Sequence, residues 1–432
     1  MFKNQKLKKR DKIAVIGLGY VGLPLACLAA SKGYQVTGLA QNKKKVAMIN
    51  DKKSPIKDSR LASWLKNVAI EATTDYKVIQ KVKIIVICVP TPVDEFYNPD
   101  LKPIRSACQS IRQYLKKGQL VIVESTINPG ICEEVIRPIL EKSGLKAGKD
   151  FYLAHCPERI NPGDKKWHVG NIPRLVGALT STGLKKAAQF YETIIDAPIR
   201  KMETIKAAEA TKIFENAFRD INIAFVNEIA KSFDRLGIDV IDVIEGAKTK
   251  PFSYLAHYPS SGVGGHCIPV DPYYLIDRAE RSGFDHQFLK LARTINNSMP
   301  LYTVSLLTKA LNKINQPVQG AKIGILGVAY KKGIDDTRES PSFVIQKLLK
   351  DLGAKLWVYD PYVPDRSNVK NIEELLDRSD GVVLVTDHPQ FMKALTAKVL
   401  KRYNVKVIID GKNVLDKQAI TKVGLIYKGI GR

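Results

Sequence analysis

A short glycine-rich turn near the start of the chain restricts the possible folds more than any other feature. The apolar residues 12–16 run directly into the turn Gly17-Leu18-Gly19-Tyr20-Val21-Gly22, and a helical stretch, LPLACLAASKG, follows. The GxGxxG spacing allows a tight turn, close backbone approach to a ligand, and a helix N-terminus directed at a phosphate. We therefore predict a strand–turn–helix unit that binds a dinucleotide; a purely structural tight turn is the alternative.

Apolar runs with the length of buried strands continue through the first part of the chain. They cover residues 34–40, 84–89, 120–124 and 152–155, and helical stretches lie between them. Strands that alternate with helices indicate a parallel, doubly wound sheet. We expect an N-terminal Rossmann-like domain over residues 1–203.

A long helical pattern with few breakers covers residues 204–236. Small or apolar residues recur there at helical spacing, which is typical of a packed helix. Helical segments continue to about residue 315, apart from the glycine-rich residues 261–271. We expect residues 204–315 to form a central helical domain that carries the dimer interface.

A second strand–turn pattern begins at residues 322–330. Further strands are expected at residues 356–359, 381–386 and 405–410. The predicted fold class is therefore α/β, with two Rossmann-like doubly wound domains joined by a long central helix. The second of these domains covers residues 316–432 and is the smaller.

Length and composition are consistent with this organisation. A chain of 432 residues exceeds the size at which one hydrophobic core usually keeps growing. The six cysteines are scattered without the spacing of a zinc site, which suggests a reducing compartment and no metal. The basic start lacks the apolar segment of a signal peptide, and the longest apolar run, residues 84–92, is too short for a bilayer. We expect a cytoplasmic protein without membrane contact.

The net charge of +25 attracts anionic partners in general. The basic residues are spread along the whole chain, and no nucleic-acid-binding motif is present. We therefore expect a small anionic substrate such as a nucleotide diphosphate, and no nucleic acid.

The end of the second strand departs from the usual dinucleotide site. Ala40 stands where an aspartate normally binds the ribose hydroxyls of adenosine. Losing the hydrogen bonds to this charged acceptor would weaken the binding free energy of the cofactor by roughly 1.5 to 3 kcal/mol, unless a neighbour such as Gln41 or Asn42 replaces the acceptor. The lysines at positions 43–45 could instead accept a 2′-phosphate, so NADP stands beside NAD as an alternative cofactor. The other interpretation is that these lysines only begin a solvated helix.

The most unusual segment is GVGGHCIPVDP at residues 262–272. Glycines beside Cys267 let a substrate carbon approach the sulfur closely, and Asp271 follows four residues later. A Cys–His hydrolase is disfavoured because adjacent residues project differently and the base normally comes from elsewhere in the sequence. From these residues alone, a nucleophile and a buried structural cysteine are equal alternatives.

Several short motifs occur in order along the chain. They are GLGYVGLP at 17–24, VPTP at 89–92, EST at 124–126, CPERINPG at 156–163, Lys212 with Asn216, GVGGHCIPVDP at 262–272, and YKK with DDTRES within 330–340. This ordered set resembles the UDP-glucose/GDP-mannose dehydrogenase family along essentially the whole chain. The GGHC form and the PERINPGD segment look like the branch that acts on UDP-N-acetylhexosamines, especially UDP-N-acetylglucosamine or its manno epimer.

The resemblance implies a double oxidation at one carbon. In this family an alcohol is oxidised to an aldehyde, which a cysteine traps as a thiohemiacetal; a second oxidation gives a thioester that is hydrolysed. Two NAD molecules are consumed per sugar, and the product serves as a polysaccharide precursor. Cys267 matches the nucleophile, which reacts as a thiolate.

The resemblance also implies roles for other residues. Lys212 matches the cation that stabilises oxyanion character at carbon 6, and Asn216, one helical turn later, projects from the same face. Thr126 and Asp271 match residues that hold a water or proton network, and Glu158 matches the general base of thioester hydrolysis. Taken singly, each of these residues could be a helix cap, a surface charge or an ion-pair member.

Cofactor and substrate contacts follow from the same motifs. Positions that match the cofactor site are Gly17, Gly19, Tyr20, Val21, Gly22, Pro90, Thr91 and Thr126. Positions that match the UDP-sugar site are Arg159, Asn161, His266, Arg293, Lys332 and Arg338. Arginine suits bidentate phosphate contacts, and Arg293 is expected to reach the site of a neighbouring subunit. The Ser260-Ser261 pair and Lys412 replace the family's usual Gly-Pro and Arg, which bears on loop geometry and affinity.

Three classes of function stay open on the sequence. The leading hypothesis is a homodimeric UDP-N-acetylglucosamine 6-dehydrogenase, with UDP-N-acetylmannosamine or UDP-glucose as alternative substrates. A two-electron 3-hydroxyacid-type dehydrogenase would share the fold and a catalytic lysine without needing Cys267. A non-catalytic nucleotide-sugar or nucleic-acid binding protein would follow if Ala40 marked a decayed cofactor site, but the intact Cys267 and Lys212 argue against decay.

Overall fold

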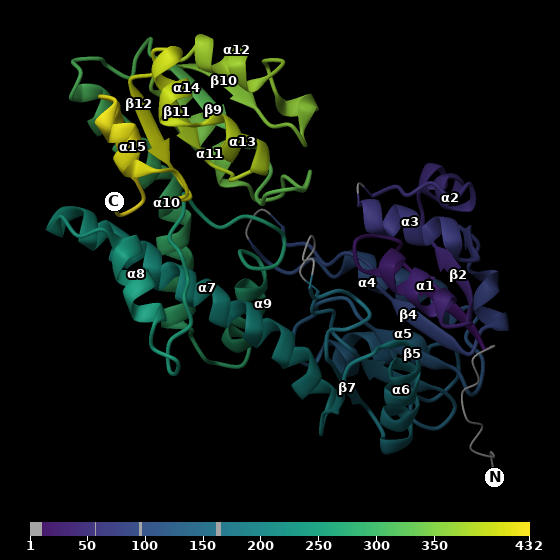
Figure 1. Ribbon diagram of the computed structural model, residues 1–432. Coiled ribbons are helices and arrows are strands. Elements are labelled where there is room, and N and C mark those ends of the chain that lie inside the picture. The colour runs from purple at the N-terminus through teal and green to yellow at the C-terminus, as the bar shows by residue number, and fades with distance from the viewer. Residues whose placement is uncertain (1–10, 57, 95–96, 161–165) are drawn as a thin grey trace. The chain divides into compact units, whose positions relative to one another are not determined.

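The computed structural model describes residues 11–56, 58–94, 97–160 and 166–432 (Figure 1). Contacts divide this part of the chain into two compact units. One unit contains the described residues up to Glu215 together with Tyr273–Phe284, and the other contains Asn216–Pro272 and Asp285–Arg432. Each unit has its own sheet and its own hydrophobic core.

The first unit contains an eight-stranded sheet with the order β3-β2-β1-β4-β5-β6-β7-β8. The strands are β1 (Lys12–Ile16), β2 (Gln35–Leu39), β3 (Ile70–Thr73), β4 (Ile84–Ile87), β5 (Leu120–Val123), β6 (Tyr152–His155), β7 (Arg174–Ala178) and β8 (Ile199–Lys201). Neighbouring strands run parallel except β6 and β7, which are antiparallel. The strand order reverses between β1 and β4, and proteins of this class bind ligands outside the carboxyl ends of strands at such a point.

Helices cover both faces of this sheet. They are α1 (Gly22–Ser31), α2 (Lys43–Asn50), α3 (Ser59–Asn67), α4 (Lys102–Arg112), α5 (Arg137–Glu141) and α6 (Ser181–Ile194), with the short turns η1 (Tyr76–Lys81) and η2 (Cys132–Ile136). Along β1, Ile13 and Val15 pack into the core that contains α1 and α6. Ala14 and Ile16 pack into the core that contains α4 and η2. The period of two along the strand therefore fills one core on each face.

Four helices occupy the middle of the chain. They are α7 (Ile205–Leu236), α8 (Val240–Lys248), α9 (Asp271–Glu280) and α10 (Gln287–Asn312). Helix α7 is 32 residues long and continues from the first unit into the second. Small residues such as Ala208, Ala217 and Ala230 are buried along it, and they allow neighbouring elements to approach closely. Residues 251–270, between α8 and α9, contain no helix or strand.

The second unit contains a five-stranded parallel sheet with the order β10-β9-β11-β12-β13. The strands are β9 (Lys322–Leu326), β10 (Lys355–Tyr359), β11 (Gly381–Leu384), β12 (Val407–Asp410) and β13 (Ile426–Gly429). The remaining helical elements are α11 (Pro341–Asp351), η3 (Pro364–Arg366), α12 (Ile372–Asp377), α13 (Pro389–Ala394), α14 (Ala397–Arg402) and α15 (Lys417–Lys422). Leu307 of α10 and Ile345 of α11 pack with Ile325 on one face, and Leu375 and Phe391 fill the core of the other.

The predicted fold class is confirmed, because both sheets are doubly wound and α7 is the long central helix. Two details differ from the prediction. The first sheet is not wholly parallel, since β6 and β7 pair antiparallel. Four strands were not predicted: β3, β7, β8 and β13.

Over the described ranges, no helix combines the length and the apolar character needed to cross a membrane. The cytoplasmic location expected from the sequence stays a prediction.

Candidate functional site

The glycine turn after β1 is shaped for close approach of a ligand. A Cβ at Gly17 would lie 2.5 Å from the carbonyl oxygen of Cys88, and a Cβ at Gly22 would lie 1.9 Å from that of Gly17. At Gly19, by contrast, a Cβ would meet nothing within 4 Å. Gly17 and Gly22 are thus required by the packing of the protein itself, whereas Gly19 leaves space for a ligand.

Helix α1 begins directly behind this turn. Its N-cap residue, Val21, provides no side-chain hydrogen bond, and the first turn contains no acidic residue. The N–H groups and the positive end of the helix dipole therefore lack a side-chain acceptor, which is the arrangement that holds a pyrophosphate. Tyr20 is exposed and Val21 half-buried at the entrance. These residues fit the phosphates of a dinucleotide.

The residues after β2 differ in whether their side chains are already bound within the protein. The side chain of Asn42 accepts the N–H of Lys45 at 3.0 Å and caps α2. Gln41 and the lysines at positions 43 and 44 are exposed. Asn42 is therefore engaged in the helix, whereas Gln41 and the lysines are accessible to a ribose or a phosphate.

Pro90, Thr91 and Thr126 follow strands β4 and β5. Because β1, β4 and β5 are adjacent parallel strands, these residues lie at the same sheet edge as the glycine turn. The carbonyl of Thr91 accepts a hydrogen bond from the hydroxyl of Tyr274. The structure thus brings the predicted cofactor positions together at one edge.

Glu158 follows β6 and is buried. Its Oε1 accepts the N–H groups of Arg159 at 2.6 Å and Ile160 at 2.7 Å. The guanidinium of Arg159 pairs with Glu215 on α7 at 2.5 Å. The carboxylate of Glu158 is therefore held in place by the backbone that follows it. Asn161 lies outside the described residues.

Lys212 and Asn216 lie one turn apart on α7, and both are half-buried. The amide of Asn216 donates a hydrogen bond to the carboxylate of Asp271, the first residue of α9, at 2.5 Å. Within the part of the chain that the structure describes, Lys212 forms no ion pair. Its ammonium is therefore available to an anionic group, and Asn216 is already positioned by Asp271.

The loop that contains Cys267 is fixed at both ends. The carbonyl of Cys267 accepts the N–H groups of Val270 at 3.1 Å and Asp271 at 2.7 Å, which places the cysteine just before α9. The N–H of Gly265 donates to the carbonyl of Arg338 at 2.9 Å. A Cβ at Gly265 would lie 2.9 Å from the ring of Tyr330, so the loop packs against that ring through glycine.

Charged groups of the second unit gather around this loop. Burial alone would lower the pKa of Arg338, but Asp336, with Tyr330 and Cys267, raises it above its ordinary value. Cys267 therefore lies within electrostatic reach of the Arg338 guanidinium. Burial would raise the pKa of Asp336, but hydrogen bonds from Arg338 and the charge of His266 lower it. Asp336 and Arg338 therefore lie within electrostatic reach of the loop residues His266 and Cys267, and the substrate role of His266 and Arg338 stays a prediction.

The exposure of Cys267 distinguishes it from the other cysteines. All six lie in the described ranges; five are buried and Cys267 is intermediate. Burial raises the pKa of Cys27 and Cys108 to about 12, which keeps those thiols protonated.

Two predicted substrate residues are engaged elsewhere in the second unit. Arg293 on α10 is buried and pairs with Asp220 on α7 at 2.6 Å. Lys332 is exposed and pairs with Asp387 at 2.9 Å. Arg293 thus has an ion-pair partner within its own chain, and its role toward a neighbouring subunit stays a prediction.

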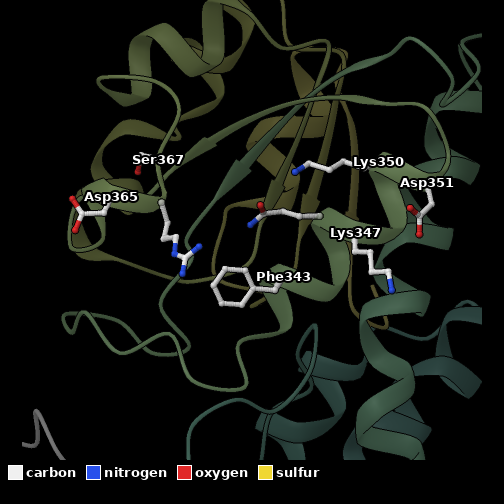
Figure 2. Close-up of a pocket in the computed structure, with 8 residues that line it drawn as sticks. Phe343, Lys347, Lys350, Asp351, Asp365 and Ser367 are labelled. Carbon is white, nitrogen blue, oxygen red and sulfur yellow. The ribbon is translucent and has the colours of Figure 1, made fainter. Parts of the chain in front are cut away.

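A surface hollow of about 520 Å³ lies beside α11 (Figure 2). It is lined by Phe343, Gln346, Lys347, Lys350, Asp351, Asp365, Arg366 and Ser367. None of the residues predicted to bind cofactor or substrate lines it. The hollow is therefore not the candidate site.

The sequence interpretation missed the side chain that lies against Glu158. Arg174, the first residue of β7, is fully buried, and its guanidinium lies 2.5 Å from the carboxylate of Glu158. An arginine directly before the apolar residues Leu175 and Val176 was the available sign, because arginine is rarely buried without a charged partner.

Three family models match this chain in succession. The NAD binding domain of the UDP-glucose/GDP-mannose dehydrogenase family matches residues 11–195, the central domain residues 206–298, and the UDP binding domain residues 324–417. The chain belongs to this family. It is therefore a UDP-sugar dehydrogenase, an oxidoreductase that uses NAD.

Relatives of known activity match over nearly the whole length of this dehydrogenase. The UDP-N-acetyl-D-mannosamine dehydrogenase of Pyrococcus horikoshii is 36% identical and covers 98% of this chain and 99% of its own. The UDP-N-acetyl-D-glucosamine 6-dehydrogenase of Pseudomonas aeruginosa is also 36% identical, over 94% of this chain and 97% of its own. A solved structure of the Pyrococcus horikoshii enzyme superposes with a TM-score of 0.91, at 36% identity over 98% of this chain and 99% of that one.

Proposed function

We propose that this dehydrogenase oxidises the 6-hydroxymethyl group of a UDP-N-acetylhexosamine to a carboxylate, in two oxidations through a thioester on Cys267. The observation that carries the proposal is the position of Cys267. It is the partly exposed thiol among the six, on a loop fixed by glycine packing and beside the guanidinium of Arg338. A nucleophilic thiolate needs access and a nearby positive charge, and this loop provides both.

The first oxidation needs a group that stabilises negative charge on the oxygen at carbon 6. Lys212 has this role in the proposal, because its ammonium has no ion-pair partner within the described residues. Asn216, held by Asp271, hydrogen-bonds the same oxygen from the next turn of α7. The glycine turn and the residues after β4 and β5 would hold NAD, which would supply the hydride acceptor for both oxidations.

The thiolate of Cys267 captures the aldehyde as a thiohemiacetal, which is then oxidised to a thioester. Hydrolysis of the thioester requires a base that removes a proton from water. Glu158 has this role in the proposal, and Thr126 and Asp271 hold the water and proton network. The thiolate of Cys267 is the leaving group, so the enzyme is regenerated.

The substrate class follows from the two relatives described above, of which one acts on the manno and one on the gluco epimer at equal identity. The sequence motifs favoured UDP-N-acetylglucosamine, with UDP-N-acetylmannosamine and UDP-glucose as alternatives. In this proposal Arg338 and Lys332 contact the diphosphate or the uracil side of the UDP-sugar. The other substrate-binding residues are Arg159, Asn161, His266 and Arg293. The domain division at residues 203 and 315, and a place in polysaccharide precursor synthesis, belong to the same proposal.

The decisive experiment measures reduced cofactor and acid product together. Purified enzyme is incubated with UDP-N-acetylmannosamine, UDP-N-acetylglucosamine or UDP-glucose and with NAD or NADP, and the product is identified by mass. Two NADH per uronate are expected, and Cys267→Ala should abolish uronate formation. The matched control is Cys108→Ala, which removes a buried thiol on α4. Full four-electron turnover by the Cys267→Ala variant, or one NADH per sugar, would contradict the proposal.

The homodimer predicted from the sequence is part of the proposal, with α7 at its interface. Phe214, Phe218 and Phe225 of this helix are 67%, 47% and 58% exposed. Their spacing places them along one side of the helix, and a row of exposed aromatic rings is typical of a protein–protein contact. Phe218→Lys combined with Phe225→Lys should convert the dimer to a monomer in light scattering. A monomeric wild type would contradict this assignment.

A further inference from the structure

A buried cluster of charged side chains lies behind Glu158 in the first unit. Arg174 is fully buried at the start of β7, and its guanidinium lies 2.5 Å from Glu158. The same guanidinium lies 3.7 Å from Glu124, which directly follows β5 and is also buried. The ring of Tyr191 on α6 completes the cluster, since its hydroxyl donates to Glu124 at 2.5 Å. One positive charge is therefore shared between two carboxylates away from solvent.

The two carboxylates are stabilised to different degrees. Glu158 is held by two backbone N–H groups and by the closer ion pair with Arg174. Glu124 has the longer ion pair, one hydroxyl donor, and the thiol of Cys88 as a donor at 4.0 Å. Burial raises the pKa of Glu124 to about 7, with a further upward contribution from Glu158, while Arg174 and Tyr191 lower it. Glu124 therefore exchanges a proton near neutrality.

Within the described residues, the cysteines and the tyrosine that face Glu124 add no charge to the cluster. Burial raises the pKa of Cys88, Cys156 and Tyr191, so all three stay protonated near neutrality. Burial alone would lower the pKa of Arg174, but Glu158 and Glu124 raise it above the ordinary value, so it stays charged. The net charge of the cluster is thus zero when Glu124 is protonated and minus one when it is ionised.

We propose that Glu124 and Arg174 are positioning residues for thioester hydrolysis, and that the protonation state of Glu124 sets how readily Glu158 accepts a proton. This inference rests on the proposed role of Glu158 as the base. In the step itself, the water oxygen bonds to the thioester carbon and one water proton goes to Glu158. The bond between that carbon and the sulfur of Cys267 breaks, and its electron pair stays on sulfur.

The net charge of the cluster explains why the protonation state of Glu124 affects proton uptake by Glu158. With Glu124 ionised, proton transfer to Glu158 changes the buried net charge from minus one to zero. With Glu124 protonated, the same transfer changes it from zero to plus one. A buried excess charge is unfavourable, so hydrolysis is faster when Glu124 is ionised. The hydrolysis rate should therefore rise with pH through neutrality.

The test follows the acyl adduct on Cys267 directly. Enzyme in excess is mixed with NAD and UDP-N-acetylmannosamine or UDP-N-acetylglucosamine, quenched at intervals, and measured by intact-protein mass spectrometry from pH 6 to pH 8.5. In the wild type, decay of the adduct should accelerate about tenfold over this range. Glu124→Gln should decay about tenfold more slowly at high pH and show no such rise, while the first oxidation keeps its rate.

Two further variants separate this role from a structural one. Tyr191→Phe removes the hydroxyl that lowers the pKa of Glu124, so the rise should move to higher pH. Glu209→Gln is the matched control, because Glu209 is another buried carboxyl whose pKa burial raises to about 7, bonded instead to Gly130 and Cys132. Its profile should match the wild type.

The outcomes distinguish this inference from the proposed function. A wild-type profile in both Glu124→Gln and Tyr191→Phe would overturn the inference and leave the thioester pathway intact. If Glu124→Gln fails to fold, Tyr191→Phe alone decides, because a profile that does not shift contradicts the coupling. Absence of any adduct on Cys267 in the wild type would instead overturn the proposed function, and the inference with it.

Discussion

The turn after β1 and the turn after β9 occupy equivalent places in two parallel sheets but differ in what their N–H groups bind. Gly17 donates to the carbonyl of Leu39 at the end of β2, and Gly327 donates to that of Tyr359 at the end of β10. The next residue along is Ala40 in the first sheet and Asp360 in the second. The two turns are therefore matched at the backbone and differ in one side chain.

The side chain of Asp360 occupies the N–H groups of the turn after β9. Its carboxylate accepts the N–H groups of Val328 and Ala329 at 2.7 and 2.8 Å and lies 3.1 Å from the buried ring of His388. After β1 the N-terminus of α1 has no side-chain cap. The comparison teaches that the backbone turn supplies the anion site, while the residue after the neighbouring strand decides whether the protein fills it.

The largest effect on stability and on NAD binding is expected from substitutions in the glycine turn after β1. Gly22→Ala places a Cβ against the carbonyl of Gly17, so it should lower the free energy of unfolding by about 3 kcal/mol and abolish NAD binding. Gly19→Ala should leave the unfolding free energy within about 0.5 kcal/mol and still weaken NAD binding, because its Cβ enters ligand space. Urea unfolding and calorimetric titration with NAD measure both. A Gly22→Ala protein as stable as the wild type would contradict the account of the turn.

A smaller effect is expected at the closed turn. Asp360→Asn keeps the shape but removes the charge that the two N–H groups and His388 stabilise, so it should cost about 2 kcal/mol of unfolding free energy at pH 7. The control is Asp365→Asn on the exposed η3 turn, which should change the unfolding free energy by less than about 0.5 kcal/mol. NAD affinity should be unchanged in both.

The pH dependence of the Asp360→Asn effect has a definite sign. Burial would raise the pKa of Asp360, but His388 and the backbone N–H groups lower it below its ordinary value of 3.8. A depressed pKa contributes stability above the unfolded-state pKa, and this contribution is lost as pH falls through the folded-state value. The difference between wild type and variant should therefore be constant from pH 7 to about pH 5 and shrink in more acidic urea titrations. A difference that grows on acidification would refute the assignment.

The smallest effect is expected when the residue after β2 is changed to the aspartate that follows β10. Ala40→Asp supplies an acceptor for the ribose hydroxyls, so the dissociation constant for NAD should fall about tenfold. The same charge repels a 2′-phosphate, so binding of NADP should weaken. Ala40→Asn, of the same size without charge, is the control. Equal effects on both cofactors would show that Ala40 does not lie beside the ribose.

Strands that are buried on both faces were predictable from the sequence. Residues 84–87 and 120–123 are continuous apolar runs because parallel central strands contact helices on both sides. The four missed strands lack this pattern. β3 and β13 carry polar residues at their sheet edges, β8 is only three residues long, and β7 begins with a charged arginine. The antiparallel pairing of β6 with β7 depends on long-range contacts that no local pattern encodes.

In the candidate site, too, some residues could be identified from local sequence motifs and others only from the fold. Motif order pointed to Asn216, Asp271, Cys267 and Arg338, whose roles stay predictions. The structure places all four in contact or electrostatic reach within the second unit. Arg174 could not be selected, because its importance depends on two carboxylates that lie 50 and 16 residues away in sequence. Only the fold of the sheet brings those three charges together.

The contrast between one accessible and five buried thiols has a practical consequence. A mild alkylating reagent should modify one site per chain, because protonated, buried thiols react slowly. Stoichiometric loss of turnover with incorporated label would then count the competent chains in any preparation. With Cys267 as the proposed nucleophile, the native sequence would allow active-site titration without removal of another cysteine.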